Sequence, residues 1–411
     1  MNLYWRFCTE DAVLYILYCR FYTADHTLLI WLKSRRKRSH CSASPAARLI
    51  MLILRLHSQV TQLFSEGRRI MYKDILSKLT NGVDLNAEEV AEIISDIRED
   101  KLTEGQISGF LVALVMKGTT LEETAYIARA MRENCIPIRP DISVEMMDTC
   151  GTGGGLSTYN ISTATALIAA AAGIPVAKHG SRSISSLSGS ADVLEALGVN
   201  INLTPEQAAE LIKEINIAFI YAPLFHPVMG KVLQPEAALG IKTIFYTIIG
   251  PLINPSFAPR HLLGVYKPEL LEQVATVAKE IGYTRAMFVH GLDGLDEISL
   301  LGKTRIMELK DGGFSTYEIE PEDFGLQRCT LEEIRTGTPE ENAATIRGVF
   351  DGSIRDARRS AVLLNAAGAL IIGDKADGFA DGIAKVAEII DSGRAAAKLD
   401  ELVRRSNAFI S

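Results

Sequence analysis

A glycine-rich stretch at residues 151–163, GTGGGLSTYNIST, has the composition of an anion-binding loop; we call it the glycine loop. Glycines allow backbone N–H groups to come close to a phosphate and to point at it together. A helix is predicted to begin near Ser162, and its positive N-terminal dipole and hydroxyl groups would attract the same anion. The stretch has neither the Gly-Lys-Ser/Thr of a Walker loop nor a dinucleotide-binding glycine pattern. We interpret it as a phosphate-binding loop; the alternative is a flexible turn between a strand and a helix.

A second polar stretch, the serine loop, occupies residues 178–190 (KHGSRSISSLSGS). It combines the cations Lys178 and Arg182 with the imidazole of His179 and six serine hydroxyls. Arginine grips phosphate oxygens with two parallel hydrogen bonds, and lysine acts as a point charge. The alternative, a solvated polar loop, fits poorly with the apolar segments on both sides. We expect His179 to orient other groups or to be hydrogen-bonded rather than to act as a general base.

A third stretch, the acidic loop, covers residues 290–299 (HGLDGLDEIS) and carries the adjacent carboxylates Asp296 and Glu297. Magnesium prefers such hard oxygen ligands, and it usually takes one or two carboxylates together with substrate oxygens and water. Beside a polyphosphate-binding loop, this pair indicates a Mg²⁺ site. The alternative is an acidic pair on the protein surface, which is a common arrangement.

Elements that could position these loops follow two patterns. Capping boxes at Asn86–Glu89, Thr103–Gln106 and Thr120–Glu123 precede apolar residues at helical spacing, so residues 73–134 are predicted to form a bundle of short helices. Strands and helices then alternate. Predicted strands lie near 144–148 and at 174–177, 218–222, 262–266 and 286–290, and predicted helices at 161–173, 191–197, 205–215 and 269–281. The chain is predicted to be almost wholly helical from residue 338 to residue 405.

This alternation predicts an α/β fold, with a small helical domain and a large domain that holds a parallel sheet covered by helices on both faces. The three polar loops each follow a predicted strand. Open parallel sheets bind ligands at the carboxyl ends of their strands, so we expect the loops to meet there.

Charge and cysteine content exclude several classes of function. The 411 residues carry a net charge of −7, but residues 1–70 hold eleven basic and four acidic side chains, which leaves −14 on the remainder. An acidic body argues against binding to nucleic acid or to an anionic membrane, which need a basic face. The six cysteines form no C-x-x-C pair, which excludes a zinc finger or disulfide scaffold and fits the cytoplasm.

The first seventy residues differ from the rest in composition. They contain both tryptophans and a basic run at residues 33–38, but no apolar run long enough to span a membrane. Helical patterning begins only after Met71. We therefore interpret residues 1–70 as an unmatched extension that a mis-assigned start site would explain; the alternative is a genuine appendage.

In the three loops and in residues 226–229 (HPVM), 243–255 (TIFYTIIGPLINP) and 365–367 (NAA), the sequence resembles the anthranilate phosphoribosyltransferase family. The resemblance covers about residues 71–408. It implies a small helical domain at 71–140, joined by a returning segment near 226–245, and a large domain at 141–411 that binds phosphoribosyl pyrophosphate. The active site would lie in the hinge cleft of a homodimer. The implied reaction is the Mg²⁺-dependent transfer of phosphoribose from phosphoribosyl pyrophosphate to the amine of anthranilate, in tryptophan biosynthesis.

The resemblance also assigns roles to individual residues. The donor would be held by Gly151, Gly154, Gly155, Thr158, Asn160, Ile161, Ser162, Thr163, Lys178, His179, Gly180, Ser181, Arg182, Ser183, Ile184, Ser185, Ser186 and Ser190. The acceptor would meet Gly151, Ser181 and Glu236, and Ser162, Asp296 and Glu297 would bind metal, with two Mg²⁺ ions per active site. We name no catalytic acid or base, because loss of a neutralised pyrophosphate requires positioning and charge stabilisation more than proton transfer.

Four positions depart from the family pattern, three of them on or near the acceptor side. The family has Asp at Gly155, Asn at Ser181 and Asn at Tyr246, and at Glu236 it has the Arg that meets the anthranilate carboxylate. Glu236 would repel an anionic acceptor if it faced the cleft, and the alternative is that it points to solvent. A different aromatic or heterocyclic amine therefore remains an alternative acceptor. A nucleoside phosphorylase of the same fold and a non-catalytic nucleic-acid-binding paralogue are further alternatives.

Overall fold

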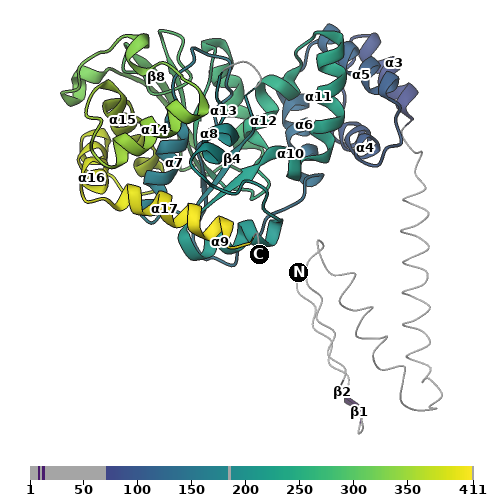
Figure 1. Cartoon of the computed structure of the whole chain (residues 1–411). Coiled ribbons are helices and arrows are strands. Elements are labelled where there is room, and N and C mark those ends of the chain that lie inside the picture. Colours follow the sequence, from purple (N-terminus) through teal and green to yellow (C-terminus); the bar gives the residue numbers. More distant parts are fainter. Residues whose placement is uncertain (1–7, 10–11, 14–70, 184–186, 410–411) are drawn as a thin grey trace. The chain divides into compact units, whose positions relative to one another are not determined.

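The computed structural model describes residues 8–9, 12–13, 71–183 and 187–409 (Figure 1). The chain divides into two compact units, residues 1–69 and 70–411. In the first unit, β1 (Cys8–Thr9) pairs antiparallel with β2 (Ala12–Val13). The rest of residues 1–70 lies outside the described part of the chain, so the interpretation of this segment stays a prediction. Within the described residues, no helix combines the length and apolar character that crossing a membrane requires.

Four short helices open the second unit, and the three predicted capping boxes begin the last three of them. They are α3 (Tyr72–Thr80), α4 (Ala87–Arg98), α5 (Glu104–Lys117) and α6 (Leu121–Glu133). At the starts of α4, α5 and α6, each predicted cap accepts a hydrogen bond from the backbone of the third helical residue, whose side chain bonds back. A later helix, α11 (Pro227–Leu239), packs against α4 and α5.

A seven-stranded sheet forms the centre of the second unit, in the order β5-β4-β3-β6-β7-β8-β9. Its strands are β3 (Met147–Asp148), β4 (Val176–Gly180), β5 (Ile217–Tyr221), β6 (Arg260–Gly264), β7 (Arg285–Gly291), β8 (Thr304–Lys310) and β9 (Gly313–Ile319). From β5 to β7 neighbouring strands pair in parallel, which confirms the predicted sheet. The two-residue strand β3 lies between β4 and β6, so the glycine loop leaves the sheet next to both of those strand ends.

The hairpin formed by β8 and β9 is a feature that the strand–helix alternation did not predict. It pairs antiparallel with β7 and extends the edge of the sheet. Its turn consists of Asp311 and Gly312, both with positive φ (50° and 74°). Such Asp-Gly turns are the strongest local signal of a hairpin, and the signal is present in the sequence.

Helices cover the sheet on both faces (Figure 1). They are α7 (Ile161–Ala171), α8 (Ser190–Ala196), α9 (Pro205–Ile215), α10 (Ala222–Phe225), α12 (Gly250–Leu252), α13 (Leu271–Glu280), α14 (Pro339–Phe350), α15 (Ala357–Ile372), α16 (Phe379–Asp391) and α17 (Arg394–Asn407). A π-helix, η2 (Phe245–Ile249), precedes α12. Short 3₁₀ helices are η3 (Pro268–Leu270), η4 (Pro321–Phe324) and η5 (Leu331–Ile334). The predicted helical C-terminal segment corresponds to α14–α17.

The buried apolar side chains form two clusters. One lies between the sheet and helices α7, α9 and α14–α17. The other joins the α3–α6 bundle to α11, η2 and α13, and it includes side chains of β6 and β7 such as Leu263 and Phe288. The segment 226–249 therefore belongs to the same apolar cluster as the four-helix bundle, although about ninety residues separate them in sequence.

Candidate active site

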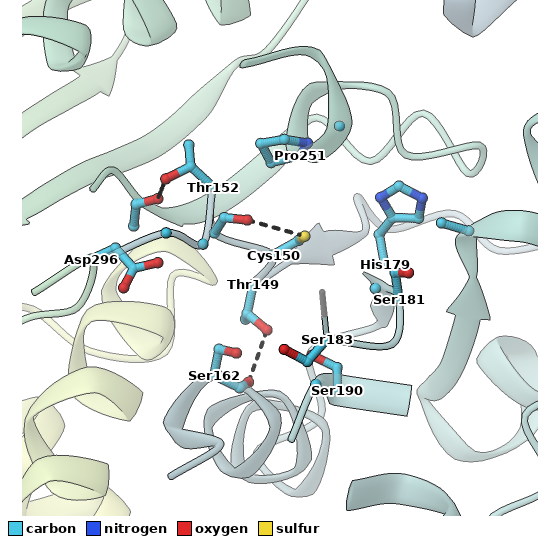
Figure 2. A pocket seen from close by; sticks show the side chains of 18 of the residues that line it. Thr149, Cys150, Thr152, Ser162, His179, Ser181, Ser183, Ser190, Pro251 and Asp296 are labelled. Carbon is cyan, nitrogen blue, oxygen red and sulfur yellow. Dashed lines mark hydrogen bonds between the residues drawn. The ribbon is translucent and has the colours of Figure 1, made fainter. Parts of the chain in front are cut away.

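A cavity of about 420 Å³ lies where the glycine loop, the serine loop and the acidic loop meet. This volume is in the range of pockets that hold a small organic ligand. Figure 2 shows Asp296 on one side of the cavity and His179 and Ser181 on the other, with Thr149 and Ser162 between them. Segments far apart in the sequence thus meet at the strand ends, as the positions of the loops predict.

Backbone strain and backbone hydrogen bonds shape the glycine loop. Gly153 and Gly154 have φ values of +62° and +86°, which other residues rarely adopt. The Thr152 N–H donates to the Gly264 carbonyl at 2.8 Å, and this bond ties the loop to the end of β6. The loop then enters α7, whose first turn brings Ser162 to the cavity wall.

Lys178 is the buried cation of the site, with only 2% of its surface exposed. Its ammonium group donates to the Thr149 carbonyl at 3.1 Å and lies 3.5 Å from the Ser162 hydroxyl. This lysine therefore sits between the first residues of the glycine loop and the start of α7, where a phosphate of a bound donor would be neutralised.

Arg182 has partners within the chain, which the sequence did not predict. Its guanidinium group pairs with Asp192 and Glu195 of α8, and it lies 5.8 Å from the centre of the Tyr221 ring. Arg182 still lines the cavity, but a phosphate would have to share it with these carboxylates or displace them.

Gly189 and Asp192 stabilise the conformation of the serine loop. Asp192 accepts hydrogen bonds from the backbone N–H groups of Ser183 (3.0 Å) and Gly189 (2.8 Å). A Cβ atom at Gly189 would lie 2.4 Å from the Ser183 nitrogen, so only glycine allows this approach. The sequence analysis did not single out Asp192. The spacing of three between Gly189 and Asp192, typical of a helix N-terminus, was the available signal.

Asp296 and Glu297 both line the cavity, and burial raises the pKa of both carboxyl groups. Burial raises the pKa of Asp296, and burial together with the neighbouring Asp296 raises the pKa of Glu297 to about 8. Two adjacent carboxylates with raised pKa values, opposite a serine hydroxyl, form a donor set that fits a hard divalent cation. Within the described residues, no group of three or more His, Cys, Asp and Glu side chains could hold a metal alone, so substrate or water would supply further ligands.

The departure at Gly155 has a structural explanation in the approach of two loops. A Cβ atom at this position would lie 2.9 Å from both the Asp296 carboxylate and the Gly294 carbonyl. Glycine at position 155 therefore lets the acidic loop pack directly against the glycine loop.

Two histidines meet at the cavity wall. His179 Nε2 and His226 Nε2 are 3.1 Å apart, and both rings are almost fully buried. Burial lowers the pKa of His226 to about 4, and burial and His226 hold the pKa of His179 well below its usual value. Both are neutral at pH 7, so only one Nε2 carries the shared hydrogen, and the other ring is protonated on Nδ1. Neither Nδ1 has a hydrogen-bond partner among the described residues.

Glu236 neither faces the cavity nor points to solvent, so both expectations for it are wrong. Its side chain is 3% exposed and does not line the cavity. One carboxylate oxygen accepts hydrogen bonds from the backbone N–H (2.9 Å) and the hydroxyl of Thr243. The other oxygen is buried and unpartnered among the described residues, and burial raises the pKa of the carboxyl group. These hydrogen bonds of Glu236 connect the C-terminal part of α11 to the segment that leads into η2.

The structure assembles most of the residues that the sequence assigned to the site. Lining the cavity are Gly151, Gly154, Gly155, Thr158, Asn160, Ser162, Lys178, His179, Gly180, Ser181, Arg182, Ser183, Ser190, Asp296 and Glu297. Ile161 and Thr163 are buried in the first turn of α7 and do not line it, and Ile184, Ser185 and Ser186 lie outside the described residues. Lining residues that the sequence analysis did not assign include His226, Met229, Leu233, Phe245 and Pro251. For His226, Met229, Phe245 and Pro251 the only signal was membership of the matched segments 226–229 and 243–255, and Leu233 lies between those segments.

Comparison with known proteins agrees with this geometry. Residues 143–396 match the family model described as the a/b domain of a glycosyl transferase family, and residues 73–135 match the model of its helical bundle domain. The fold is that of this class of glycosyl transferase. Within it, the chain belongs to the anthranilate phosphoribosyltransferase family. The anthranilate phosphoribosyltransferase of Acetivibrio thermocellus is 47% identical over 342 residues, which are 83% of this chain and 98% of that protein. The enzyme of Petrotoga mobilis is 46% identical with the same coverage.

Solved structures give the same result. The crystal structure of anthranilate phosphoribosyltransferase from Thermus thermophilus has a TM-score of 0.75 and 38% identity, and the match covers 81% of this chain and 99% of that one. The Saccharomyces cerevisiae enzyme, solved in complex with phosphoribosyl pyrophosphate and Mg, has a TM-score of 0.74 and 27% identity over 82% of this chain and 98% of its own.

Proposed function

We propose that this protein catalyses the Mg²⁺-dependent transfer of phosphoribose from phosphoribosyl pyrophosphate to the amine of anthranilate, a step of tryptophan biosynthesis. One observation carries the proposal: the glycine loop, Lys178 and the Asp296–Glu297 pair line a single cavity. That set of groups suits a ligand with several phosphates and a divalent cation. The family membership supports the same substrates.

The donor would lie between the glycine loop and the serine loop. Backbone N–H groups of Gly151, Gly154 and Gly155 and the hydroxyls of Thr158 and Ser162 would bind phosphate oxygens, and the Lys178 ammonium group would neutralise part of their charge. Ser162, Asp296 and Glu297 would hold Mg²⁺. Bound Mg²⁺ would supply further neutralisation of the pyrophosphate leaving group. Because Ser162 belongs to α7 and the carboxylates belong to the loop after β7, the ligands form two sets, and we propose two ions per site.

The remaining part of the cavity would hold the acceptor. His226, Met229, Leu233, Tyr246 and Pro251 give it an apolar wall with one imidazole. A planar aromatic ring fits such a wall, and a neutral amine held near the ribose could attack without a strong base. The chain's contribution is to hold the two substrates in line and to exclude water from between them.

Pyrophosphate release from phosphoribosyl pyrophosphate tests the function. We expect release that requires both Mg²⁺ and anthranilate, with one pyrophosphate formed for each anthranilate consumed. Assays with aniline and with heterocyclic amines in place of anthranilate define the acceptor class, because Glu236 does not occupy the role that the family gives to arginine. Phosphate-dependent cleavage of nucleosides, without pyrophosphate release, would instead establish the phosphorylase alternative.

We further propose that the protein is a homodimer. Val112, Val115 and Met116 share one face of α5 and are 40%, 45% and 80% exposed, which is unusual for neighbouring large apolar side chains. Light scattering coupled to size exclusion should give twice the chain mass. The variant Val115→Glu should shift the population to monomer.

The domain division at residues 71–140 and 141–411, with a hinge near 226–245, is also a proposal. Contacts of α11 with α4 and α5 support it.

The three described cysteines, Cys135, Cys150 and Cys329, are unpaired, which supports a location in the reducing cytoplasm.

A further inference from the structure

One buried carboxylate, Asp148, connects the starts of two loops that line the cavity. Its Oδ1 accepts hydrogen bonds from the backbone N–H groups of Thr149 (2.6 Å) and Cys150 (3.1 Å), the two residues that lead into the glycine loop. The same oxygen accepts from the N–H of His179 (3.1 Å), the second residue of the serine loop. Asp148 has no exposed surface. Two phosphate-facing segments from neighbouring strands thus share one acceptor atom.

The other oxygen of Asp148 reaches a third segment. Asn254 Nδ2 donates to Asp148 Oδ2 and to the Ala177 carbonyl, both at 2.8 Å. Asn254 Oδ1 in turn accepts from the N–H (2.9 Å) and the hydroxyl (2.7 Å) of Ser256. Asn254 follows α12, close to the η2 segment that forms the acceptor wall of the cavity. The network therefore joins the donor loops to the segment on which the acceptor wall is built.

Thr149 and Cys150 directly precede the glycine loop, and each of their backbone N–H and C=O groups bonds to a buried side chain. Asp148 receives both N–H groups of Thr149 and Cys150, and Lys178 donates to the Thr149 carbonyl at 3.1 Å. His261 Nε2 lies 2.7 Å from the Cys150 carbonyl, and a carbonyl can only accept, so this nitrogen is the donor. No rotation of these two peptide groups is possible without breaking a buried hydrogen bond, which is costly.

If Asp148 only stabilised its own turn, it would need fewer hydrogen bonds than it makes. A residue that only capped its own turn would bond to Thr149 and Cys150, as Asp side chains often do. Asp148 also bonds to β4 and to Asn254, and no ion pair within the described residues neutralises it. A buried carboxylate held by N–H groups from three separate segments fixes their relative positions, since charge-assisted hydrogen bonds are short and directional.

We propose that Asp148 is a positioning residue for phosphoribosyl transfer: it sets the register of the glycine loop against the serine loop and couples both to the acceptor wall through Asn254. The proposal rests on the proposed function for its kinetic consequences, but the positions of the loops can be measured without any substrate.

The variant Asp148→Asn tests the proposal with little change in shape. An amide can still accept with its oxygen, but its NH₂ group would face Asn254 Nδ2, and two donors cannot bond to each other. We expect hydrogen–deuterium exchange of the ligand-free protein to become at least about tenfold faster in both residues 149–155 and residues 179–183. We expect kcat/KM for phosphoribosyl pyrophosphate to fall about 100-fold, the size of effect that a small misplacement of a bound substrate produces.

Two further variants control for loss of stability. Asn200 bonds to Ser406 far from the cavity, and Asn200→Ala should lower Tm while exchange in the two loops and donor kinetics stay at wild-type values. Asn254→Ala removes the hydrogen bonds that connect the third segment to Asp148 and Ala177. It leaves the three backbone N–H bonds to Asp148 in place. It should raise acceptor KM more than donor KM. The double variant Asp148→Asn, Asn254→Ala should be no worse than Asp148→Asn alone, because the two residues act as one unit.

Several results would contradict the positioning role of Asp148. Faster exchange in only one loop, or in neither, would overturn the proposal, as would donor kinetics within about twofold of wild type in Asp148→Asn. If Asp148→Asn does not fold, Asn254→Ala alone decides the coupling to the acceptor wall: donor KM and acceptor KM both within about twofold of wild type would overturn it as well. A wild-type protein that releases no pyrophosphate disproves the proposed function, yet the exchange experiment still decides the role of Asp148.

Discussion

The two ends of the cavity are built in different ways. At the proposed donor end, backbone N–H groups of the glycine loop would make most contacts to phosphate. Buried side chains hold that backbone in place: Asp148, Lys178 and His261 satisfy the peptide groups before the glycine loop. At the acceptor end, the wall consists of side chains on α11 and η2, and the Nδ1 atoms of His179 and His226 have no partner among the described residues. A backbone site tolerates few changes of geometry, whereas a side-chain wall can change its chemistry one residue at a time.

This difference explains where the chain departs from its family. Ser181 and Tyr246 line the cavity at the proposed acceptor end, and Glu236 bonds to Thr243 in the segment that leads to Tyr246. The fourth departure, Gly155, lies in the glycine loop, where a side chain would collide with Asp296. We infer that the donor end sets the reaction and that the acceptor end sets which amine is accepted.

The largest expected effect is at the metal site of the donor end. Replacing both carboxylates, Asp296→Asn with Glu297→Gln, preserves shape but removes the two anionic ligands. We expect turnover to fall by about 1,000-fold, while the affinity for phosphoribosyl pyrophosphate falls less because the glycine loop and Lys178 remain. Steady-state kinetics over a Mg²⁺ titration measures both quantities, and chelation of Mg²⁺ in the wild type should abolish turnover. Wild-type turnover by the double variant at limiting Mg²⁺ contradicts the assignment.

The donor end was predictable from sequence because its signals are local. Glycines, serines and the adjacent acids of residues 151–163, 178–190 and 290–299 are contiguous in sequence, and the strand–helix alternation places them at one edge of the sheet. The helix caps of α4, α5 and α6 are local for the same reason. The role of Asp148 is not local, since its partners come from three separate segments between residues 149 and 254, and no pattern in the sequence shows which strands become neighbours.

The acceptor end was predicted less well. Matching Glu236 to a family arginine did not predict its environment, because the position of a residue in an alignment does not reveal what its side chain bonds to. Its partner, Thr243, is only seven residues away, but the contact depends on the turn at Gly240, which ends α11 with a φ of +67°. The β8–β9 hairpin was missed although its Asp-Gly turn is local, since the strand–helix alternation was given more weight.

The second expected effect is a loss of folding stability at low pH that originates at His226, at the acceptor end of the cavity. His226 has a pKa near 4 in the folded protein, because burial excludes the charged form, against 6.5 in an unfolded chain. Below pH 6.5 the unfolded state binds the extra proton, so the contribution is fully present above pH 6.5 and is lost as the pH falls toward 4. The loss approaches about 3 kcal/mol at pH 4, at ~1.4 kcal/mol per pH unit. His179, which faces His226, shifts in the same direction.

Urea unfolding of wild type and His226→Gln between pH 7 and pH 4 measures this contribution as a difference. The other acid-labile groups are common to both proteins, so the variant should lose less free energy of unfolding over that range. Parallel curves for the two proteins would mean that His226 has the same pKa in the folded and the unfolded state.

The third expected effect separates the two ends most directly. Glu236→Ala leaves the N–H and hydroxyl of Thr243 without their buried acceptor and should lower the free energy of unfolding by about 1–3 kcal/mol. Loosening of the segment before η2 should displace Tyr246 and raise the KM for anthranilate about tenfold, equivalent to ~1.4 kcal/mol, with donor KM unchanged. Glu236→Gln retains an oxygen acceptor and serves as the matched control, with values near wild type.

The variant Glu236→Arg tests the alternative that the side chain can turn into the cavity. A buried guanidinium group without a partner is costly, so we expect lower stability and no gain in anthranilate affinity. A tenfold lower anthranilate KM in Glu236→Arg would show instead that position 236 can contact the acceptor, as the family pattern implies.

The smallest effect is expected from removal of residues 1–70. Among the described residues, the lining of the cavity begins at Thr149, and the buried members of the two apolar clusters begin at Ile75. A protein that begins at Met71 should therefore keep donor and acceptor KM within about twofold and Tm within ~2 °C of the full chain. The same protein provides the reference for the variants above, because any change seen only in the full chain would have to involve the extension. A loss of several degrees in Tm with unchanged kinetics would show that the extension stabilises the body without reaching the site, and a change in either KM would mean that one end of the cavity depends on it.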